Sequence, residues 1–560
     1  MDNKQIIYFG ALILLYVGVF ACTARSECDV LARTTSGWVR GTRRLARRGC
    51  VYASFRGIPY ARQPYGELRF QELQPAEPWD GILDATTEGP VCPYNEVTLY
   101  GPLWQPQGVS EGCIHVNVHV PIADLPNPYK KVDPCGGLPI VVHVHGGAFV
   151  WGSGDADVHG PEHIISKGVI VITLNYRLGV IGLLSMNNIK IPGNNALRDV
   201  VTALRWVQAN ARFFGGNPDE VTLSGLSGGA TFAHVLTMSP AAAGLFKRVW
   251  LMSGTAIQSY YTASPVYAQE TANMLLSYLG INCTDDEEIH AQLIKIPIGE
   301  LITASGKVRA RRGLTSFVPV IETPRPGFTT ILSEDPEVLL AQGKGNNIPM
   351  VIGLTNKECE TIRRMLEESH IIEMFKRNPL TSLHLGAVYS LPPNVTARMA
   401  EKMRQRYFRG APTMDEFVRL CSDSLFAYPV LKAARARVMA GGAPVYLYKF
   451  AYNAEYSPIK QALNLTYCGA GHSEDLTHIY QVNTWPLSPS AADEAMKDMM
   501  TDLYVNFIKY NDPSPGDVSW PPYPRNQYFY IRDAWNKRYI KMTQCDQDMV
   551  KFYDKLYGRR

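Results

Sequence analysis

Apolar and polar positions along the chain predict strands and helices that follow one another in turn. Residues 114–120 alternate with a period of two, which is typical of a half-exposed strand. Residues 138–144 and 169–174 are nearly continuous apolar runs, as in strands buried on both faces. Residues 195–214 place apolar side chains at helical spacing. Further strands are expected at 221–224, 249–252, 349–354, 445–450 and 528–531, and a further helix at 230–238.

Strands that alternate with helices predict an α/β fold, in which helices cover both faces of a mostly parallel sheet. The chain has 560 residues, and apolar types make up 46% of them against 19% charged. This balance excludes a disordered chain, which combines low hydrophobicity with a large net charge. The net charge is only +4, so nothing indicates a nucleic-acid partner or a polybasic membrane-binding surface.

The N-terminus has the layout of a secretory signal peptide. Lys4 precedes an apolar run over 6–21, and small residues follow it. We therefore expect a signal peptide over 1–24 and a secreted mature chain without a membrane anchor. A retained signal anchor is the alternative, because the run is slightly long for a signal peptide.

An extracellular location favours disulfides and glycosylation. Among eleven Cys, the pair Cys92 and Cys113 closes a short loop and is the first candidate for a disulfide. Asn282, Asn394 and Asn464 each begin an Asn-x-Thr sequon, so we expect glycans there.

A candidate nucleophile lies in Gly225-Leu226-Ser227-Gly228-Gly229, which matches G-x-S-x-G. The motif follows an expected strand and opens an expected helix. A serine on such a turn is raised above the sheet, and the flanking glycines avoid a clash within the turn. An ordinary glycine-rich turn is the alternative, because the pattern also arises by chance.

A second glycine-rich loop, residues 145–149 (HGGAF), follows the buried strand at 138–144. Small residues there allow backbone N–H groups to point into a cleft and receive the oxyanion of acyl transfer. The N–H of Gly228 would add another donor. A phosphate-binding loop is the alternative, but no Gly-Lys-Ser/Thr follows.

A nucleophilic serine needs a base, and the base needs an acid that orients it. His472 lies late in the chain on a small-residue loop, which suits a ring that reaches across a cleft. Glu358 follows the expected strand at 349–354 after a short turn, and Glu360 is the competing acid. The order Ser, Glu, His is that of α/β-hydrolases.

These segments resemble the type-B carboxylesterase and cholinesterase family of α/β-hydrolases, and within it the secreted insect esterases. The resemblance runs over about 29–556 and includes the segments FRGIPYA, LRF, SEGC, NYRLG, GNNALRD, FFGGNPDEVTL and FVPVIE. It implies the α/β-hydrolase fold, with a large, mostly parallel central sheet. It also implies the nucleophile, base, acid, three oxyanion donors and first disulfide, which fall on Ser227, His472, Glu358, Gly147, Ala148, Gly228 and Cys92–Cys113.

The resemblance implies further supporting residues. Two structural ion pairs fall on Arg69–Glu111 and Arg177–Asp199, and Ser253 falls beside the acid. A second family disulfide would use Cys283, but its partner position has no cysteine.

Departures from the family pattern bear on the substrate. Leu226 and Gly228 flank the serine where the family usually has Glu or Gln and then Ala, so no carboxylate is available for a cationic substrate. Trp104 resembles the aromatic residue that faces choline, and cation–π attraction alone supplies about 0.5–2 kcal/mol. Two acyl-pocket aromatics are replaced by Gly313 and Thr315. We therefore expect a roomy apolar site, little activity on choline esters, and lower turnover than with Ala at 228.

The sequence thus predicts a serine carboxylic-ester hydrolase that acts on a small apolar ester through an acyl-enzyme and uses no metal or cofactor. Juvenile hormone, acetate pheromones or odorants, lipids and xenobiotic esters all fit. The three triad residues span about 245 positions yet must meet, which favours one catalytic domain over 25–560. A weakly active or inactive protein that sequesters ligands or mediates adhesion is the alternative.

Overall fold

A computed structural model describes most of the chain after the N-terminal segment. The described residues are 29–94, 101–131, 136–258, 262–312, 316–486, 488–516, 519–523, 527–534, 538–541 and 544–558. The predicted signal peptide at 1–24 lies outside them, and so do Gly313 and Thr315.

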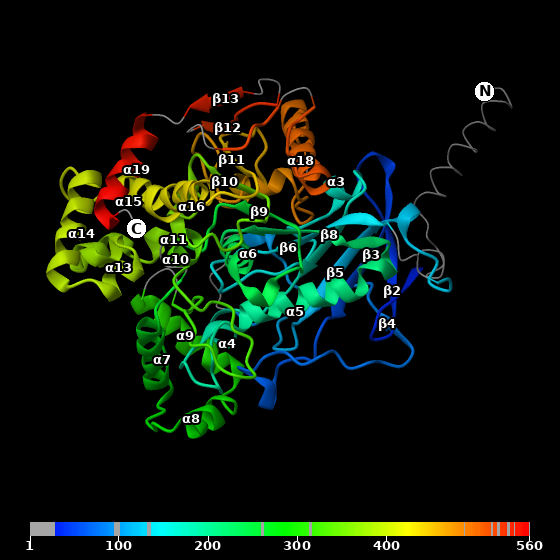
Figure 1. Ribbon diagram of the computed structural model, residues 1–560, viewed down its shortest axis with the longest axis horizontal. Helices are drawn as coiled ribbons and strands as arrows, with labels where there is room; N and C mark the ends of the chain where they lie inside the picture. The colour runs from blue at the N-terminus through cyan, green and yellow to red at the C-terminus, as the bar shows by residue number, and fades with distance from the viewer. Residues whose placement is uncertain are drawn as a thin grey trace, which may run out of the picture.

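One 13-stranded sheet organises the described part of the chain (Figure 1). Its path runs β1-β2-β3-β5-β7-β6-β8-β9-β10-β11-β12-β13, and β4 pairs with β2 off this path. The strands are β1 (Asp29–Arg33), β2 (Trp38–Leu45), β3 (Val51–Pro59), β4 (Ile82–Asp84), β5 (His115–Pro121), β6 (Leu138–Val144), β7 (Ile170–Leu174), β8 (Gly216–Leu226), β9 (Arg248–Met252), β10 (Met350–Thr355), β11 (Val445–Phe450), β12 (Gln527–Ile531) and β13 (Arg538–Lys541).

The centre of the sheet is parallel and its two ends are antiparallel. Strands β7, β6, β8, β9, β10, β11 and β12 pair in parallel along the path. The β1–β2, β2–β3, β3–β5, β5–β7 and β12–β13 pairs are antiparallel. Because the carboxyl ends of parallel strands meet at one edge, the loops after β6 to β11 can build a common site.

Helices cover both faces of the central strands, as the apolar runs predict. Within β6, Val142 packs in the cluster that contains Val200 of α5 (Asn195–Asn210), whereas Val141 packs in the cluster that contains Leu503 of α18 (Ala491–Tyr510). The α-helices are α3 (Glu162–Ile165), α4 (Gly179–Leu183), α5 (Asn195–Asn210), α6 (Gly228–Met238), α7 (Pro265–Leu279), α8 (Asp286–Leu293), α9 (Ile298–Arg312), α10 (Pro336–Ala341), α11 (Arg363–Glu368), α12 (Ile371–Arg377), α13 (Leu385–Ser390), α14 (Pro393–Tyr407), α15 (Met414–Cys421), α16 (Tyr428–Met439), α17 (Pro458–Ala462), α18 (Ala491–Tyr510) and α19 (Gln544–Tyr557).

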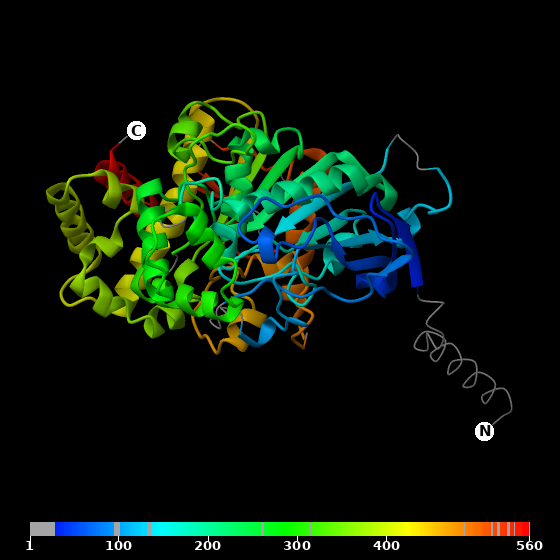
Figure 2. The same ribbon diagram turned by 90° about the horizontal axis from the view of Figure 1, so that it is seen from below.

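The molecule has a strand-rich end and a helix-rich end. The N-terminal strands β2 to β4 lie at one end, and helices α7 to α9 and α13 to α15 lie at the other (Figures 1 and 2). The C-terminal helix α19 returns to the helix-rich end, where Asp554 pairs with Arg435 of α16 at 2.7 Å. No helix among the described residues is long and apolar enough to cross a membrane.

The predicted α/β-hydrolase fold is confirmed, but several element boundaries differ and some strands were not predicted. The strand expected at 221–224 is the longer β8, which continues to Leu226. The helix expected at 195–214 ends at Asn210 and continues as a 3-10 turn. The first four strands were not predicted; β2 ends in three exposed residues, and β4 has only three residues, two of them exposed.

Candidate active site

The candidate nucleophile and its supports come from three adjacent parallel strands. Leu226 at the end of β8 lies beside Met252 at the end of β9, and Met252 lies beside Gly353 of β10. The residues that follow continue this register, since the N–H of Ser227 donates to the Met252 carbonyl at 2.8 Å and the N–H of Ser253 to the Gly353 carbonyl at 2.9 Å. The sheet therefore places Ser227 and Ser253 at one edge.

Ser227 stands on a tight strand-to-helix turn. Its φ of 55° and ψ of −121° lie outside the regions that non-glycine residues ordinarily occupy. The turn has no room for side chains at its glycines: a Cβ on Gly225 would lie 2.4 Å from the Gly229 backbone, and one on Gly229 would lie 2.1 Å from the Val144 carbonyl oxygen. The surrounding structure thus holds Ser227 in a conformation that costs on the order of 1–3 kcal/mol.

A buried acid–base pair lies beside this turn. The Nδ1 atom of His472 is 2.7 Å from Oε2 of Glu358. The other carboxylate oxygen accepts from the Ser253 hydroxyl and from the Thr355 N–H, each at 2.7 Å. An ionised Glu358 requires the proton on Nδ1, which leaves Nε2 of the neutral ring as an acceptor. The arrangement suits a base whose tautomer is fixed by its acid.

Backbone contacts join the loop of the base to the loop of the acid. The N–H of His472 donates to the Glu358 carbonyl at 3.1 Å, and the N–H of Lys357 donates to the Ala470 carbonyl at 2.9 Å. Below the ring, the Tyr448 hydroxyl donates to Asp475 at 2.7 Å, while burial raises the pKa of Asp475 to about 6. The two loops therefore form one unit at the end of β10 and β11.

Glu360, the competing acid, has a different environment. It accepts from Nε of Arg363 at 3.0 Å, and Arg363 also contacts Asp415 at 2.7 Å. Of the two candidate acids, Glu358 is the one that contacts His472.

The glycine-rich loop after β6 has a constrained backbone beside Ser227. Gly147, Ala148 and Phe149 have φ values of 109°, 51° and 65°. A Cβ on Gly147 would lie 2.0 Å from the Trp151 carbonyl oxygen, so only glycine fits there. A Cβ on Gly146 would lie 3.3 Å from the Ser227 Cβ, which places this loop against the nucleophile.

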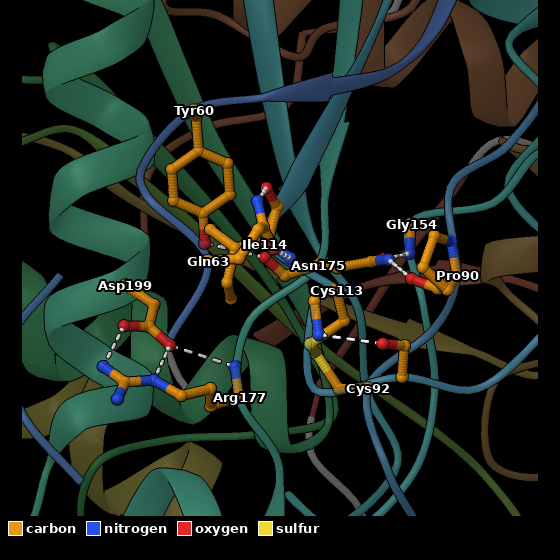
Figure 3. The surroundings of a disulfide bond; sticks show 12 residues. Tyr60, Gln63, Pro90, Cys92, Cys113, Ile114, Gly154, Asn175, Arg177 and Asp199 are labelled. Carbon is orange, nitrogen blue, oxygen red and sulfur yellow. Dashed lines mark hydrogen bonds and ion pairs between the residues drawn. A yellow bond between two sulfur atoms is a disulfide. The ribbon is translucent and has the colours of Figure 1, made fainter. Parts of the chain in front are cut away.

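The segment after β7 contacts the glycine-rich loop through Tyr176, and Asn175 of the same segment is shown in Figure 3. The Tyr176 hydroxyl donates to the His145 carbonyl at 2.8 Å, and the two rings stack at 4.3 Å. The Asn175 side chain accepts from the Gly154 N–H at 2.8 Å and donates to the Pro90 carbonyl at 3.4 Å. Burial lowers the pKa of His145 to about 3, so the ring is neutral and Nδ1 bonds the Gly146 carbonyl at 2.7 Å.

The predicted disulfide and both predicted ion pairs form. Cys92 and Cys113 are joined, with Cα atoms 4.9 Å apart, near the buried pair of Arg177 and Asp199 (Figure 3). Nη2 of Arg177 is 2.6 Å from Asp199, which is fully buried. The second predicted pair also forms, because Arg69 makes two contacts of 2.7 Å with the Glu111 carboxylate.

Comparison with known proteins identifies the family. The carboxylesterase family matches residues 29–549, nearly the whole described chain. The chain belongs to the carboxylesterase family. It is a carboxylic ester hydrolase of the α/β-hydrolase fold.

Two similar proteins are named as juvenile hormone esterases. The enzyme from Heliothis virescens is 45% identical over 552 residues, which cover 96% of this carboxylesterase and 97% of that protein. The crystal structure of the Manduca sexta enzyme, with OTFP covalently attached, has a TM-score of 0.91 and 45% identity, and covers 95% and 100% of the two chains. Venom carboxylesterase-6 of Apis mellifera is 29% identical, with 95% and 94% covered.

Trp104, Leu226 and Gly228, for which the sequence predicted roles toward the substrate, each lie in a different environment in this carboxylesterase. Trp104 is buried, donates to the Ser153 hydroxyl at 3.0 Å and packs against Trp151, which follows the glycine-rich loop. Leu226 is buried in the cluster beneath β8, β9 and β11. Gly228 lies against Phe149: a Cβ there would be 3.0 Å from two of its ring carbons.

A second disulfide was not predicted from the sequence. It joins Cys359, directly after Glu358, to Cys421 at the end of α15. The next residues, Ser422–Ala427, form a π-helix, η9, whose Phe426 ring lies 4.8 Å from the His472 ring. The adjacency of Cys359 to the acid was visible in the sequence, but nothing there indicated Cys421 as its partner.

The remaining predicted cysteine and sequons lie at the surface. Cys283 is half-buried and has no disulfide partner among the described residues, in agreement with the missing family cysteine. Asn282, Asn394 and Asn464 are all exposed, so a glycan at any of them would meet solvent.

An apolar cavity lies behind the loop of the acid. Its volume is about 60 Å³, and Cys421 and Leu425 form part of its wall. The other lining residues are mainly apolar and come from helices α9, α11, α12 and α15, the turn near 381 and η9: Arg312, Leu366, Ile371, Met374, Thr381, Ser382, Phe417, Leu420 and Ser424. The cavity therefore adjoins the segment that bears Phe426.

Proposed function

We propose that this carboxylesterase hydrolyses apolar esters with Ser227 as nucleophile, His472 as base and Glu358 as the orienting acid. The Ser227 oxygen attacks the ester carbonyl while Nε2 of His472 takes the hydroxyl proton. The carbon–oxygen bond to the alcohol then breaks, and the alcohol leaves with that proton. An acyl-serine remains.

Water completes the reaction by the reverse proton path. His472 accepts a proton from water, hydroxide adds to the acyl carbon, and the bond to the Ser227 oxygen breaks as that oxygen regains the proton. The N–H groups of Gly147, Ala148 and Gly228 are the proposed donors to the oxyanion in both steps. Each such donor is worth roughly 2.7–4 kcal/mol in the transition state.

The observation that carries this proposal is the filled hydrogen-bond set of Glu358. One oxygen bonds His472 at 2.7 Å, while the other bonds Ser253 and the Thr355 N–H. A carboxylate held in this way keeps the imidazole in the tautomer that can take a proton from serine, and it stabilises the imidazolium that results. A protein that only binds ligands has no need of this arrangement.

An apolar substrate is supported by the surroundings of the site. Leu226 precedes the nucleophile and offers no carboxylate for a cationic group. Because two proteins of 45% identity are named juvenile hormone esterases, a juvenile hormone is the first natural ester to test.

We also propose that the protein is secreted after removal of residues 1–24 and that residues 25–560 act as one catalytic domain. The three exposed sequons suit an extracellular protein. The support for one domain is that the three proposed catalytic residues lie in the segments that follow β8, β10 and β11 of a single sheet.

A turnover screen with the mature, full-length chain tests the substrate class. The panel contains nitrophenyl esters of increasing acyl length, a choline ester and juvenile hormone, with Ser227→Ala as the blank. We expect kcat/KM to rise with acyl length and to be lowest for choline. Equal or greater turnover of the choline ester would contradict the apolar site, and a single burst without turnover would indicate ligand sequestration.

A further inference from the structure

The π-helix η9 (Ser422–Ala427) is positioned between the catalytic base and the apolar cavity. A π-turn inserts an extra residue into a helix, and such turns occur frequently at functional sites. Here α15 leads into η9 and α16 continues from it. The side chain of Phe426 meets the His472 ring at 4.8 Å with an interplanar angle of 49°. The neighbouring Leu425 lines the cavity.

Two bonds attach the start of this π-helix to the loop of the acid. The disulfide joins Cys421, which precedes η9, to Cys359, which follows Glu358. The N–H of Cys359 also donates to the Ser422 hydroxyl at 3.1 Å, and that hydroxyl donates to the Val418 carbonyl at 2.9 Å. Both cysteines are buried, so the attachment is a permanent part of the core.

The acid and the aromatic ring therefore reach His472 from two ends of one bonded unit. Glu358 holds the edge of the imidazole at Nδ1, while Phe426 covers part of its surface. Rotation of the ring about its Glu358 hydrogen bond would displace Nε2, the atom proposed to take the Ser227 proton. A misplacement of about 1 Å at a reacting centre can cost about 100-fold in rate.

We propose that Phe426 is a positioning residue for His472, and that the Cys359–Cys421 disulfide holds it in place through η9. Phe426 limits rotation of the imidazole and presents π-electron density to the imidazolium formed during the reaction. This proposal rests on the proposed function of His472 as base.

The test compares two substitutions at one position with a matched control elsewhere in the core. Phe426→Leu removes the aromatic ring, and Phe426→Tyr keeps it. Phe55→Leu is the control, because Phe55 is also fully buried and also meets one aromatic neighbour, Phe214, at 5.3 Å. The substrate is p-nitrophenyl acetate, whose short acyl group does not require the cavity. Active sites are counted by exhaustive organophosphate labelling.

We expect Phe426→Leu to lower kcat per labelled site about tenfold, with KM within about twofold, since orientation acts on the chemical step. Phe426→Tyr should recover kcat to within about threefold. Phe55→Leu should keep the wild-type kcat and KM.

The proposal is overturned if Phe426→Leu behaves like Phe55→Leu, or if Phe426→Tyr fails to recover the rate. The double variant Cys359→Ala/Cys421→Ala should reproduce the loss of kcat, and a wild-type kcat per labelled site would remove the disulfide from the proposal. If this variant does not fold, the Phe426 pair still decides. An active wild type separates any of these failures from a failure of the proposed esterase activity.

Discussion

The two disulfides found among the described residues of this carboxylesterase belong to regions with different tasks. Cys92–Cys113 closes a loop of 21 residues on the side of the sheet where Arg177 pairs with Asp199. Cys359–Cys421 spans 62 residues and begins directly after the proposed catalytic acid. We call Cys92–Cys113 together with the Arg177–Asp199 pair the N-terminal support. We call Cys359–Cys421 together with Glu358, Ser253 and Phe426 the base clamp.

The difference between the regions is what their buried groups contact. In the N-terminal support, buried charges and hydrogen bonds fix one backbone segment to another. In the base clamp, the buried hydrogen bonds and contacts are made to Glu358 and His472, the groups proposed to act in proton transfer. Removing a buried hydrogen bond, ion pair or disulfide should therefore lower the free energy of unfolding in the first region and kcat in the second.

The largest effect is expected from the buried ion pair of the N-terminal support. Asp199→Ala leaves the Arg177 guanidinium buried without its partner, which should lower the free energy of unfolding by about 3–5 kcal/mol. Asp219→Ala is the control, since its contact with Arg212 is 3.9 Å long and exposed. Denaturant unfolding measures both. A loss below about 1 kcal/mol for Asp199→Ala would contradict the prediction that this ion pair stabilises the fold.

Removing the short disulfide should also reduce stability more than turnover. Cys92→Ala/Cys113→Ala frees a loop of 21 residues, which by chain entropy costs about 3 kcal/mol. The folded fraction should keep kcat per labelled site within about threefold. A tenfold loss of kcat at full labelling would instead show that this loop positions catalytic groups, and the comparison would fail.

In the base clamp, Ser253→Ala should show the opposite pattern. Ser253 donates to the Glu358 carboxylate at 2.7 Å, and a hydrogen bond to a charged group is worth about 1.5–3 kcal/mol. We expect kcat to fall about 10- to 100-fold and the thermal midpoint to change little. The exposed Ser390→Ala is the control. A change in the midpoint with kcat intact would assign Ser253 to stability alone.

The pH dependence of stability tests the core shared by both regions. Burial lowers the pKa of His234 on α6 to about 3, below its ordinary value of 6.5. The unfolded chain therefore binds this proton at a higher pH than the folded chain does. The contribution of neutral His234 to the free energy of unfolding is fully present above about pH 6.5 and falls by about 1.4 kcal/mol per pH unit below it. When the pH is lowered from 7.5 to 5.5, the free energy of unfolding of His234→Gln should fall by about 1 kcal/mol less than that of the wild type. Parallel curves for the two proteins would contradict the buried neutral ring.

The smallest effect is expected at Gly228. An added Cβ would lie 3.3 Å from the backbone nitrogen of Phe149, whose ring stacks on Phe232 at 4.8 Å and cannot withdraw freely. Gly228→Ala should therefore disturb the glycine-rich loop and lower kcat a few-fold, equivalent to about 1 kcal/mol. Higher turnover in the variant would support the expectation from sequence that glycine at this position slows the enzyme.

Local patterns predicted those parts of the molecule that depend on neighbouring residues. Buried strands such as β6 and β7 were evident from apolar runs, and the Ser227 turn from its glycines. Cys92–Cys113 followed from its short separation. The choice of Glu358 over Glu360 needed the family resemblance, because two acids two residues apart look alike until the fold places one beside His472.

The base clamp could not be predicted, because its members meet only in three dimensions. Eleven cysteines allow many pairings, and Cys421 lies 62 residues from its partner. The π-helix has the same apolar content as a regular helix, so no periodicity marks it. Phe426 becomes relevant to catalysis only through that local geometry.

The most direct test of the central claim is covalent labelling of Ser227. An organophosphate should modify one residue per chain, that residue should be Ser227, and the loss of ester hydrolysis should follow the extent of modification. Ser227→Ala should not be labelled, and its kcat should fall on the order of 10⁶-fold. Wild-type hydrolysis of a short nitrophenyl ester by Ser227→Ala would contradict the proposed mechanism.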